Sequence, residues 1–422
     1  MEAFQLGDFE ITVDKKGATR FSKVSYPIRY GRFSEIKTPE HIFEFNLNGE
    51  IKYIRGLGRS WPHPAEWLKR TDADDWVYYS VGDYNGIFSL LGEYYRPCFA
   101  YSSNSIWQSN PFTNPQVQQA LTAWPELQRN LRIRRMNGIP ARIRDALGLI
   151  CIHDAAALRK RSKRLHQLIG GQVSVLPPDT RHVDYEVIPL MIADGCLYHC
   201  DFCCIKSRQV FRPRSKENIS EQIRQLQAFY GVNLSNYSAV FLGNHDSLAA
   251  GRELICMAAA EAYSAFHLDQ SNMSDPTLFL FGSVDSLLKG GHSLAEALNQ
   301  LPFYTYINIG FESADSQTLH RLNKPLETNK IKAAFQMMLD INRSYHHIEI
   351  SANFLLGDQL PPDHYRSLIE LVRGRLDRFY SKGAIYLSPL NTSRNQRDLI
   401  RKFIEIKNLS RLPTFLYLIQ RL

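Results

Sequence analysis

The sequence predicts an α/β protein in two main parts, an α+β domain over residues 1–180 and an open, TIM-like (β/α)6 barrel over residues 181–395. Two observations predict this division. All five tryptophans lie in the first 124 of the 422 residues, and from residue 184 onward short apolar runs alternate with helical stretches. Such alternation is typical of a parallel sheet with helical crossovers. Residues 396–422 are expected to form a helical tail.

A β-hairpin is predicted early in the amino-terminal domain. Residues 42–54 alternate apolar and polar side chains on both sides of the pair Asn48-Gly49. This pair suits the positive φ angles of a type I′ turn. We therefore expect antiparallel strands in this domain, in contrast to the barrel.

Positive charge concentrates in residues 129–164, which contain eleven Arg or Lys against two acidic residues. Apolar residues recur there at helical spacing, which predicts two basic helices separated near Gly138 and Pro140. Two interpretations stay open: a surface for nucleic acid or anionic lipid, and a solvated face of helices packed on the second domain. The net charge of +8 permits an anionic partner without requiring one.

Six barrel strands are predicted, with helices such as Ser215–Tyr230 and Arg252–Phe266 between most of them. The carboxyl ends of such strands meet at one face of the barrel, and barrel enzymes carry their chemistry there. The loops that follow the strands are therefore the places to look for function. The predicted strands are Tyr185–Ala193, Ser238–Leu242, Thr277–Ser283, Thr305–Phe311, His347–Leu355 and Ala384–Leu387.

Four of the seven cysteines fall within nine residues, directly after the first of these strands. Cys196, Cys200 and Cys203 have the spacing CxxxCxxC, which lets three thiolates on one loop bind a single inorganic centre. Structural zinc sites usually have four ligands in paired short spacings, and the sequence contains no second CxxC pair. A 4Fe-4S cluster with one open iron is therefore predicted, and zinc is the alternative.

Cysteine usage also bears on the cellular compartment. An odd, clustered set of cysteines excludes a distributed disulfide framework and favours a reducing compartment. No apolar run approaches the roughly 18 to 20 residues of a membrane span, and the first residues lack the apolar stretch of a signal peptide. We expect a cytoplasmic protein without a membrane span.

With its three cysteines and the aromatic Phe202 in the pattern CxxxCx-aromatic-C, the chain resembles the radical S-adenosylmethionine (radical SAM) superfamily. FLGNHDSLA after the second strand is similar to the Elongator-like, Fe-S oxidoreductase type. The resemblance implies a partial barrel, a 4Fe-4S cluster bound by Cys196, Cys200 and Cys203, and reductive cleavage of S-adenosyl-L-methionine to a 5′-deoxyadenosyl radical. It further implies an external one-electron donor such as flavodoxin or ferredoxin.

The same resemblance implies which residues bind the cofactor. Gly243 and Asn244 lie where the family has a glycine-rich turn that holds the methionine amino group. Glu312 and Ser313 match the family's Gly-x-Glu-Ser segment, which contacts the ribose hydroxyls and the amino group. Lys324 is placed to pair with the methionine carboxylate, and the alternative is that it caps the preceding helix. No catalytic side chain is assigned, because the cofactors supply the hard chemistry.

The leading interpretation is thus a radical SAM enzyme that abstracts hydrogen from an unassigned substrate. One alternative is a radical SAM enzyme that modifies RNA, with the basic helices binding the nucleic acid. An alternative from another class is a regulator in which the three thiolates bind zinc and the basic helices bind nucleic acid. The amino-terminal domain matches no family by these motifs.

Overall fold

The computed structural model describes ten parts of the chain, and Asn244, a predicted cofactor residue, lies outside them. The parts are residues 1–21, 29–80, 95–96, 110–133, 138–173, 175–203, 209–243, 245–390, 396–418 and 422. Within them, no helix has both the length and the hydropathy that crossing a bilayer requires.

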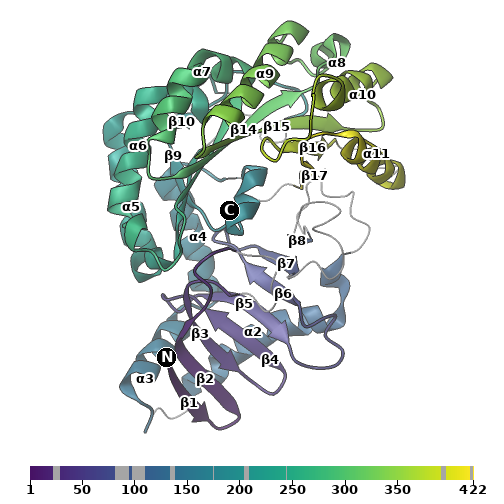
Figure 1. The fold of residues 1–422 in the computed structure, drawn as a ribbon. Helices are drawn as coiled ribbons and strands as arrows, with labels where there is room; N and C mark the ends of the chain where they lie inside the picture. Colours follow the sequence, from purple (N-terminus) through teal and green to yellow (C-terminus); the bar gives the residue numbers. More distant parts are fainter. Residues whose placement is uncertain are drawn as a thin grey trace.

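The amino-terminal domain is built on an eight-stranded antiparallel sheet whose strands follow one another in chain order (Figure 1). Alternate apolar residues such as Phe9, Ile11 and Val13 are buried, and they pack with the helices α2 and α3 in one hydrophobic core. The strands are β1 (Glu2–Leu6), β2 (Phe9–Lys16), β3 (Arg32–Lys37), β4 (His41–Phe45), β5 (Ile51–Gly56), β6 (Glu66–Arg70), β7 (Trp76–Ser80) and β8 (Tyr95–Arg96).

The predicted hairpin is present as β4 and β5, but its turn differs from the prediction. Gly49 has a positive φ of 81°, whereas Asn48 is absent from the residues with positive φ, so the turn is not type I′. The connection is longer, because the backbone of Asn46 bonds that of Glu50. Asn48 instead donates to the carbonyl of Tyr230 at 2.9 Å, which ties the hairpin to the second domain.

The described residues of the stretch 129–164 belong mainly to three helices rather than to the two predicted. They are α2 (Pro115–Ile133), α3 (Ala141–Ile152) and α4 (Ala155–Ile169). The break near Gly138 is where it was expected, but a second break follows His153. There, the carboxylate of Asp154 accepts hydrogen bonds from the backbone N–H groups of Ala156 and Ala157 and so begins α4 as its N-cap.

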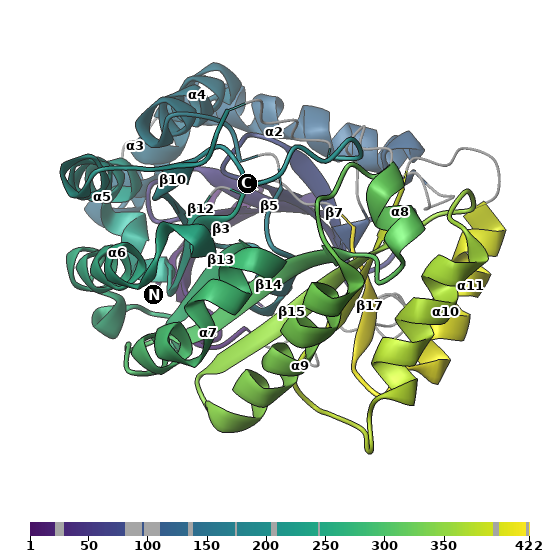
Figure 2. The same cartoon turned by 90° about the horizontal axis from the view of Figure 1, so that it is seen from above.

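The second domain contains a seven-stranded parallel sheet in the order β17-β16-β15-β14-β13-β12-β9, and it forms the predicted open barrel. Helices lie in an arc on its outer side (Figure 2). The strands are β9 (Ile188–Met191), β12 (Ala239–Gly243), β13 (Thr277–Ser283), β14 (Tyr304–Glu312), β15 (Ile348–Leu356), β16 (Ile385–Pro389) and β17 (Thr414–Leu416). The helices are α5 (Lys216–Tyr230), α6 (Arg252–Ala265), α7 (Val284–Asn299), α8 (Ser316–Arg321), α9 (Thr328–Ser344), α10 (Pro362–Ile369) and α11 (Gln396–Leu409).

All six predicted barrel strands are present, with ends that differ by up to three residues. The seventh strand, β17, was expected to be part of a helical tail. Only α11 of that tail is helical, and β17 pairs with β16 at the edge of the sheet. The apolar pattern of a three-residue strand is too short for its periodicity to distinguish a strand from a helix.

The chain has two large hydrophobic cores, and they divide within α4. Leu158 belongs to the core of the amino-terminal sheet, whereas Leu165 and Ile169 belong to the core of the barrel. The predicted boundary at residue 180 falls after this division. One helix therefore contributes to both cores.

A buried ionic cluster joins the two domains. The ammonium group of Lys69, on β6, lies 2.7 Å from Glu186 and 3.8 Å from Asp184, just before β9. Only 3% of the Lys69 side chain is exposed. Glu186 also pairs with Lys52 at 2.8 Å. Charges buried to this degree are stabilised only by partners of opposite charge, since water no longer solvates them.

We expect Lys69→Met to lower the free energy of unfolding by about 3–5 kcal/mol, because it leaves two buried carboxylates short of a cation. The measurement is urea denaturation. Lys37→Met is the control on the same sheet, since Lys37 pairs with Glu10 at 3.5 Å and both side chains are about half exposed. The control should change stability by less than about 1 kcal/mol. Equal effects of the two variants would show that the cluster does not stabilise the domain junction.

Candidate functional site

The loop that contains Cys196, Cys200 and Cys203, called here the cysteine loop, begins where the first barrel strand ends. A short antiparallel ribbon of β10 (Ala193–Asp194) and β11 (Arg212–Pro213) closes its base. Arg214, just after β11, forms two bonds to the carboxylate of Asp194, at 2.6 and 2.9 Å, and a third to the carbonyl of Ile169. Arg214 therefore anchors the loop.

The three motif cysteines are half-buried and free of disulfides. Burial raises the pKa of the Cys196 thiol, and it raises that of Cys200 to about 12. The positive charge of Lys324 acts on both thiols in the opposite direction. Among the described residues, no three Cys, His, Asp or Glu side chains are already gathered as a metal-binding group. The role of these cysteines as ligands stays a prediction.

Two further contacts hold the cysteine loop against the barrel rim. The hydroxyl of Tyr198 donates to the carboxylate of Asp285, in the first turn of α7, at 2.6 Å. Lys330, on α9, donates to the other oxygen of this carboxylate at 2.9 Å. The backbone N–H of Asp201 bonds the carbonyl of Leu322 at 3.1 Å. The sequence motif gave no sign of these anchors, because their partners lie far along the chain.

Glu312 ends β14 in an unusual backbone conformation. Its φ is 65°, and the N–H of Ser313 bonds the carbonyl of Phe311 at 2.8 Å, so Glu312 is the centre of a three-residue γ-turn. Such a turn is rare and strained for a residue with a side chain. The neighbouring Gly310 leaves room for the Glu312 carboxylate, which would lie 2.6 Å from a Cβ at that position.

Lys324 pairs with Glu312 inside the protein. Its ammonium group lies 3.1 Å from the Glu312 carboxylate and donates to the carbonyl of Gly310 at 2.7 Å. It also lies 5.4 Å from the centre of the Tyr198 ring, on the cysteine loop. The structure thus brings two predicted cofactor residues into contact. The side chain of Lys324 thus bonds to the end of β14 and does more than cap the preceding helix.

The remaining predicted cofactor residues have different surroundings. Gly243 ends β12, and a Cβ there would lie 2.6 Å from Met191, so the residue allows a close approach between neighbouring strands. Ser313 is fully buried, and its hydroxyl lies 2.8 Å from Nδ1 of His364. Phe202 is half-buried on the cysteine loop.

Asp246 lies in the FLGNHDSLA segment, and the sequence alone did not assign it a role. It follows β12 and is 2% exposed. One carboxylate oxygen accepts from the backbone of Ser283 at 3.1 Å and from the hydroxyl of Ser286 at 2.8 Å. The other oxygen is buried and has no hydrogen-bond partner among the described residues. Burial raises the pKa of Asp246, whose charge in turn acts on the Cys196 thiol.

These residues form one region at the carboxyl ends of the strands. The charges of Lys324 and Glu312 act on the thiol of Cys200, and those of Lys324 and Asp246 act on the thiol of Cys196. A buried cation, two buried carboxylates and soft sulfur ligands therefore lie near one another. Such a set suits a metal centre beside a zwitterionic ligand.

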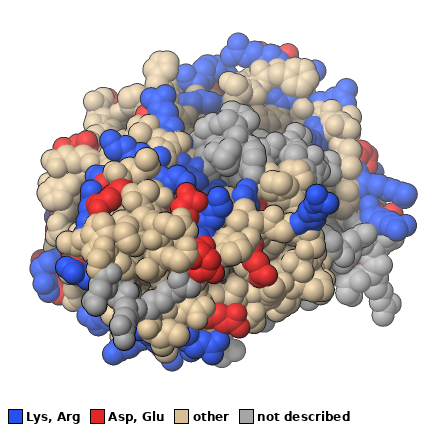
Figure 3. All heavy atoms as spheres, turned by 90° about the horizontal axis from the view of Figure 1, so that it is seen from below, with Lys and Arg blue, Asp and Glu red and all other residues tan. Residues whose placement is uncertain are grey.

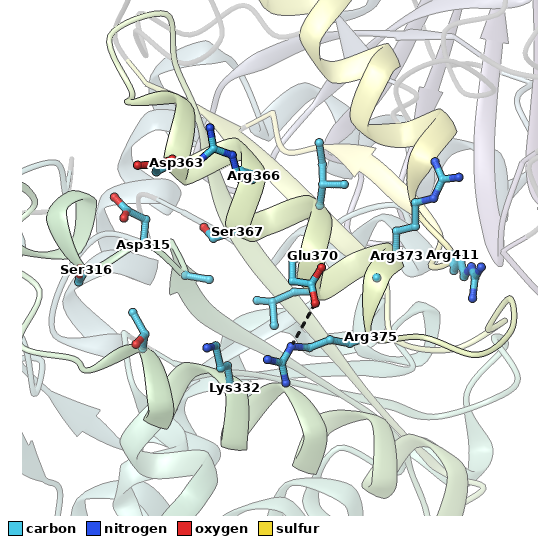
Figure 4. A pocket seen from close by; sticks show the side chains of 15 residues that line it. Asp315, Ser316, Lys332, Asp363, Arg366, Ser367, Glu370, Arg373, Arg375 and Arg411 are labelled. Atoms are coloured by element: carbon cyan, nitrogen blue, oxygen red, sulfur yellow. Dashed lines mark hydrogen bonds and ion pairs between the residues drawn. The ribbon is translucent and has the colours of Figure 1, made fainter.

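A separate groove of 820 Å³ lies on the outer side of the barrel, between α9 and α10 (Figure 4). Its carboxylates have partners: Asp363 pairs with Arg366, and Glu370 lies 4.0 Å from Arg375. None of the predicted site residues lines it, so it is not the candidate cofactor site. The described lining residues are Ala314, Asp315, Ser316, Thr328, Lys332, Asp363, Arg366, Ser367, Ile369, Glu370, Leu371, Arg373, Gly374, Arg375 and Arg411.

Some basic side chains of residues 129–164 form ion pairs with acidic residues of the amino-terminal domain. Arg142 pairs with Asp14 at 2.6 Å, and Arg161 pairs with Glu50. Seen from below, basic groups are spread over the molecule with acidic groups between them (Figure 3). α2, α3 and the start of α4 pack on the amino-terminal sheet, and not on the second domain as the second interpretation expected. The nucleic-acid surface stays an untested prediction.

Comparisons with known proteins give only distant matches. No family model and no curated protein sequence matches the chain. Streptococcus suis SuiB bound to S-adenosylmethionine matches with a TM-score of 0.37 and 11% identity, over 84% of this chain and 72% of SuiB. The cobalamin-dependent S-adenosylmethionine radical enzyme OxsB, with aqua-cobalamin and S-adenosylmethionine bound, matches with a TM-score of 0.34 and 16% identity.

The match to OxsB covers 53% of this chain and 30% of OxsB, so the chain spans about a third of that protein. A radical SAM methyltransferase from Sphaerobacter thermophilus matches with a TM-score of 0.36 and 15% identity, over 55% of this chain and 65% of that protein. Scores this low assign neither a family nor a function. The functional conclusion therefore depends on the site itself.

Proposed function

We propose that the protein is a radical SAM enzyme that binds a 4Fe-4S cluster and S-adenosyl-L-methionine at the rim of its barrel. The observation that carries the proposal is the buried set of Glu312, Lys324 and Asp246 beside the cysteine loop. Lys324 and Glu312 lie in contact at 3.1 Å, and one buried oxygen of Asp246 has no hydrogen-bond partner within the described part of the chain. Burying such charges is costly unless a ligand or a partner compensates them.

The donor set fits the cluster. The three cysteines lie on one loop after β9, none is in a disulfide, and sulfur is the ligand that iron–sulfur clusters take. When bound, the reduced cluster supplies the single electron that breaks a carbon–sulfur bond of S-adenosylmethionine. Binding of the cluster requires the thiols to lose their protons, since only thiolates are ligands.

The chain's own residues would bind and orient the methionine part of the cofactor. The unpartnered oxygen of Asp246 is an acceptor for an ammonium group, and the ammonium of Lys324 is a donor for a carboxylate. Glu312 is positioned by its γ-turn to accept from hydroxyl or ammonium groups. Gly243 is buried at the end of β12, and its carbonyl accepts a hydrogen bond from the backbone N–H of Ile192 at 3.0 Å. Asp246 therefore joins the predicted residues as the acceptor for the amino group.

The decisive experiment is anaerobic reconstitution with iron and sulfide, followed by reduction in the presence of S-adenosylmethionine. We expect about four iron and four acid-labile sulfide atoms per chain, and release of 5′-deoxyadenosine. One zinc per chain without sulfide would contradict the proposal and favour the zinc-binding regulator. A deuterium label transferred from a candidate substrate into 5′-deoxyadenosine would identify the substrate, and a flavodoxin or ferredoxin would serve as the electron donor.

A further inference from the structure

His364, on α10, links the end of β15 to Ser313, the residue that follows β14. It is fully buried, and its Nε2 lies 2.9 Å from the carbonyl oxygen of Leu355. A carbonyl only accepts hydrogen bonds, so Nε2 carries the proton. In the neutral ring Nδ1 is then an acceptor. The hydroxyl of Ser313, 2.8 Å away, therefore donates its proton to Nδ1.

The neutral form of His364 agrees with its surroundings. Burial lowers the pKa of His364. The charge of Asp315 acts on the ring in the opposite direction with a smaller effect, and the ring of Tyr365 packs against His364 with the ring centres 4.9 Å apart. A protonated ring would present a second N–H to the Ser313 hydroxyl in place of an acceptor.

The hydroxyl of Ser313 has no proton left to donate to an outside ligand. Its proton is directed to His364, and its oxygen accepts from the backbone N–H of Asp315 at 3.0 Å. The residue is also fully buried. The Ser313 side chain is thus bonded inside the protein, and the ribose contact that the Gly-Phe-Glu-Ser segment implies stays a prediction.

We propose that Ser313 and His364 are positioning residues that hold the strained γ-turn at Glu312 in the geometry that binds the cofactor. The inference deepens the proposed function and rests on it. Glu312 is joined directly to Ser313, and the turn bond runs from the Ser313 N–H to Phe311. Fixing the Ser313 side chain from α10 therefore fixes the peptide that follows Glu312.

The turn needs such support because the sheet alone does not determine it. The register between β14 and β15 shifts between Gly310 and Glu312, so the regular ladder is interrupted at this point. A positive φ persists only where the surrounding structure imposes it. Lys324 holds the carboxylate of Glu312, and the Ser313–His364 bond holds its backbone. Together they fix both ends of the residue.

Three variants separate the two hydrogen bonds of His364. His364→Asn places an amide near the position of Nδ1 and keeps an acceptor for Ser313. His364→Gln places an amide near Nε2, so it keeps the donor to Leu355 but leaves Ser313 without its acceptor. Ser313→Ala removes the same bond from the other side with a small change of volume. Thermal unfolding first establishes that each variant is folded.

We expect His364→Gln and Ser313→Ala to raise the KM for S-adenosylmethionine about tenfold, with the loss on KM rather than on kcat and with wild-type iron content. His364→Asn should stay close to the wild type. In the metal-free protein, the amides of residues 311–317 should exchange hydrogen faster in the first two variants than in His364→Asn.

Each outcome has a distinct meaning. A wild-type protein that binds iron and sulfide but does not cleave S-adenosylmethionine contradicts the proposed function. In that case, hydrogen exchange of the metal-free variants still tests whether Ser313 and His364 fix the γ-turn at Glu312. If the wild type is active, and Ser313→Ala and His364→Gln match it in KM and in amide exchange, the positioning role is wrong. If His364→Asn fails as severely as His364→Gln, the bond to Leu355 rather than that to Ser313 carries the effect, which also overturns the proposal.

Discussion

Replacing Cys196, Cys200 or Cys203 with serine is expected to abolish both cluster binding and cleavage of S-adenosylmethionine. Each cysteine supplies one of only three protein ligands, and a serine hydroxyl is a poor substitute for a soft thiolate. The loss should be complete for each single variant, because two ligands on a loop do not retain the cluster. Iron and acid-labile sulfide analysis after anaerobic reconstitution measures the first effect, and chromatography of 5′-deoxyadenosine measures the second.

Cys256→Ser is the matched control for these variants. Cys256 is also free and half-buried, but it lies on α6, on the outer side of the barrel. We expect its iron content and its activity to equal those of the wild type. A motif variant that keeps a full complement of iron and sulfide would show that the ligand lies elsewhere, and the proposed centre would then be wrong.

Asp246→Asn is expected to weaken the binding of S-adenosylmethionine by about a hundredfold and to leave the cluster in place. The substitution keeps an oxygen for the bonds from Ser283 and Ser286. It replaces the unpartnered carboxylate oxygen, which accepts an ammonium group, with an amide N–H2 that repels one. Loss of a buried, charge-assisted bond accounts for an effect of this size. Titration of the reduced cluster with the cofactor, followed by electron paramagnetic resonance, measures the affinity.

The stability of the same variant provides an independent check. Burial raises the pKa of Asp246 above its ordinary value of 3.8. The stabilising contribution of this group is therefore fully present below pH 3.8 and is lost as the pH rises through the folded-state pKa. At neutral pH the buried charge destabilises the protein, so Asp246→Asn should unfold at the same or a higher denaturant concentration. A variant that loses both affinity and stability would indicate a structural role for Asp246 instead.

Much of the barrel could be predicted because its strands are buried on both faces. All five residues of β12 are buried, and the sequence shows this as the apolar run Ala239–Leu242 that ends at Gly243. β13 has the same ends as its prediction, Thr277–Ser283. The three-residue strand β17 gave no such signal. The break between α3 and α4 depends on Asp154 as the N-cap of α4, and the charge pattern of this stretch does not reveal that role.

The candidate site was predictable only where its residues are close in sequence. The spacing of Cys196, Cys200 and Cys203 is visible in eight residues, whereas Ser313 and His364 are 51 positions apart. The positive φ of Glu312 and the unpartnered oxygen of Asp246 depend on how distant strands and helices pack. Such properties arise from tertiary structure, and a single sequence contains no local pattern for them.

The helix shared by the two hydrophobic cores limits how the chain can be divided. A shortened protein that begins at residue 181 lacks Leu165 and Ile169, which are fully buried in the barrel core. Their removal would expose apolar surface on the barrel and invite aggregation. A barrel meant to fold alone should therefore start at Asp154, the N-cap of α4, with Leu158 changed to a polar residue because its partners in the other core would be missing.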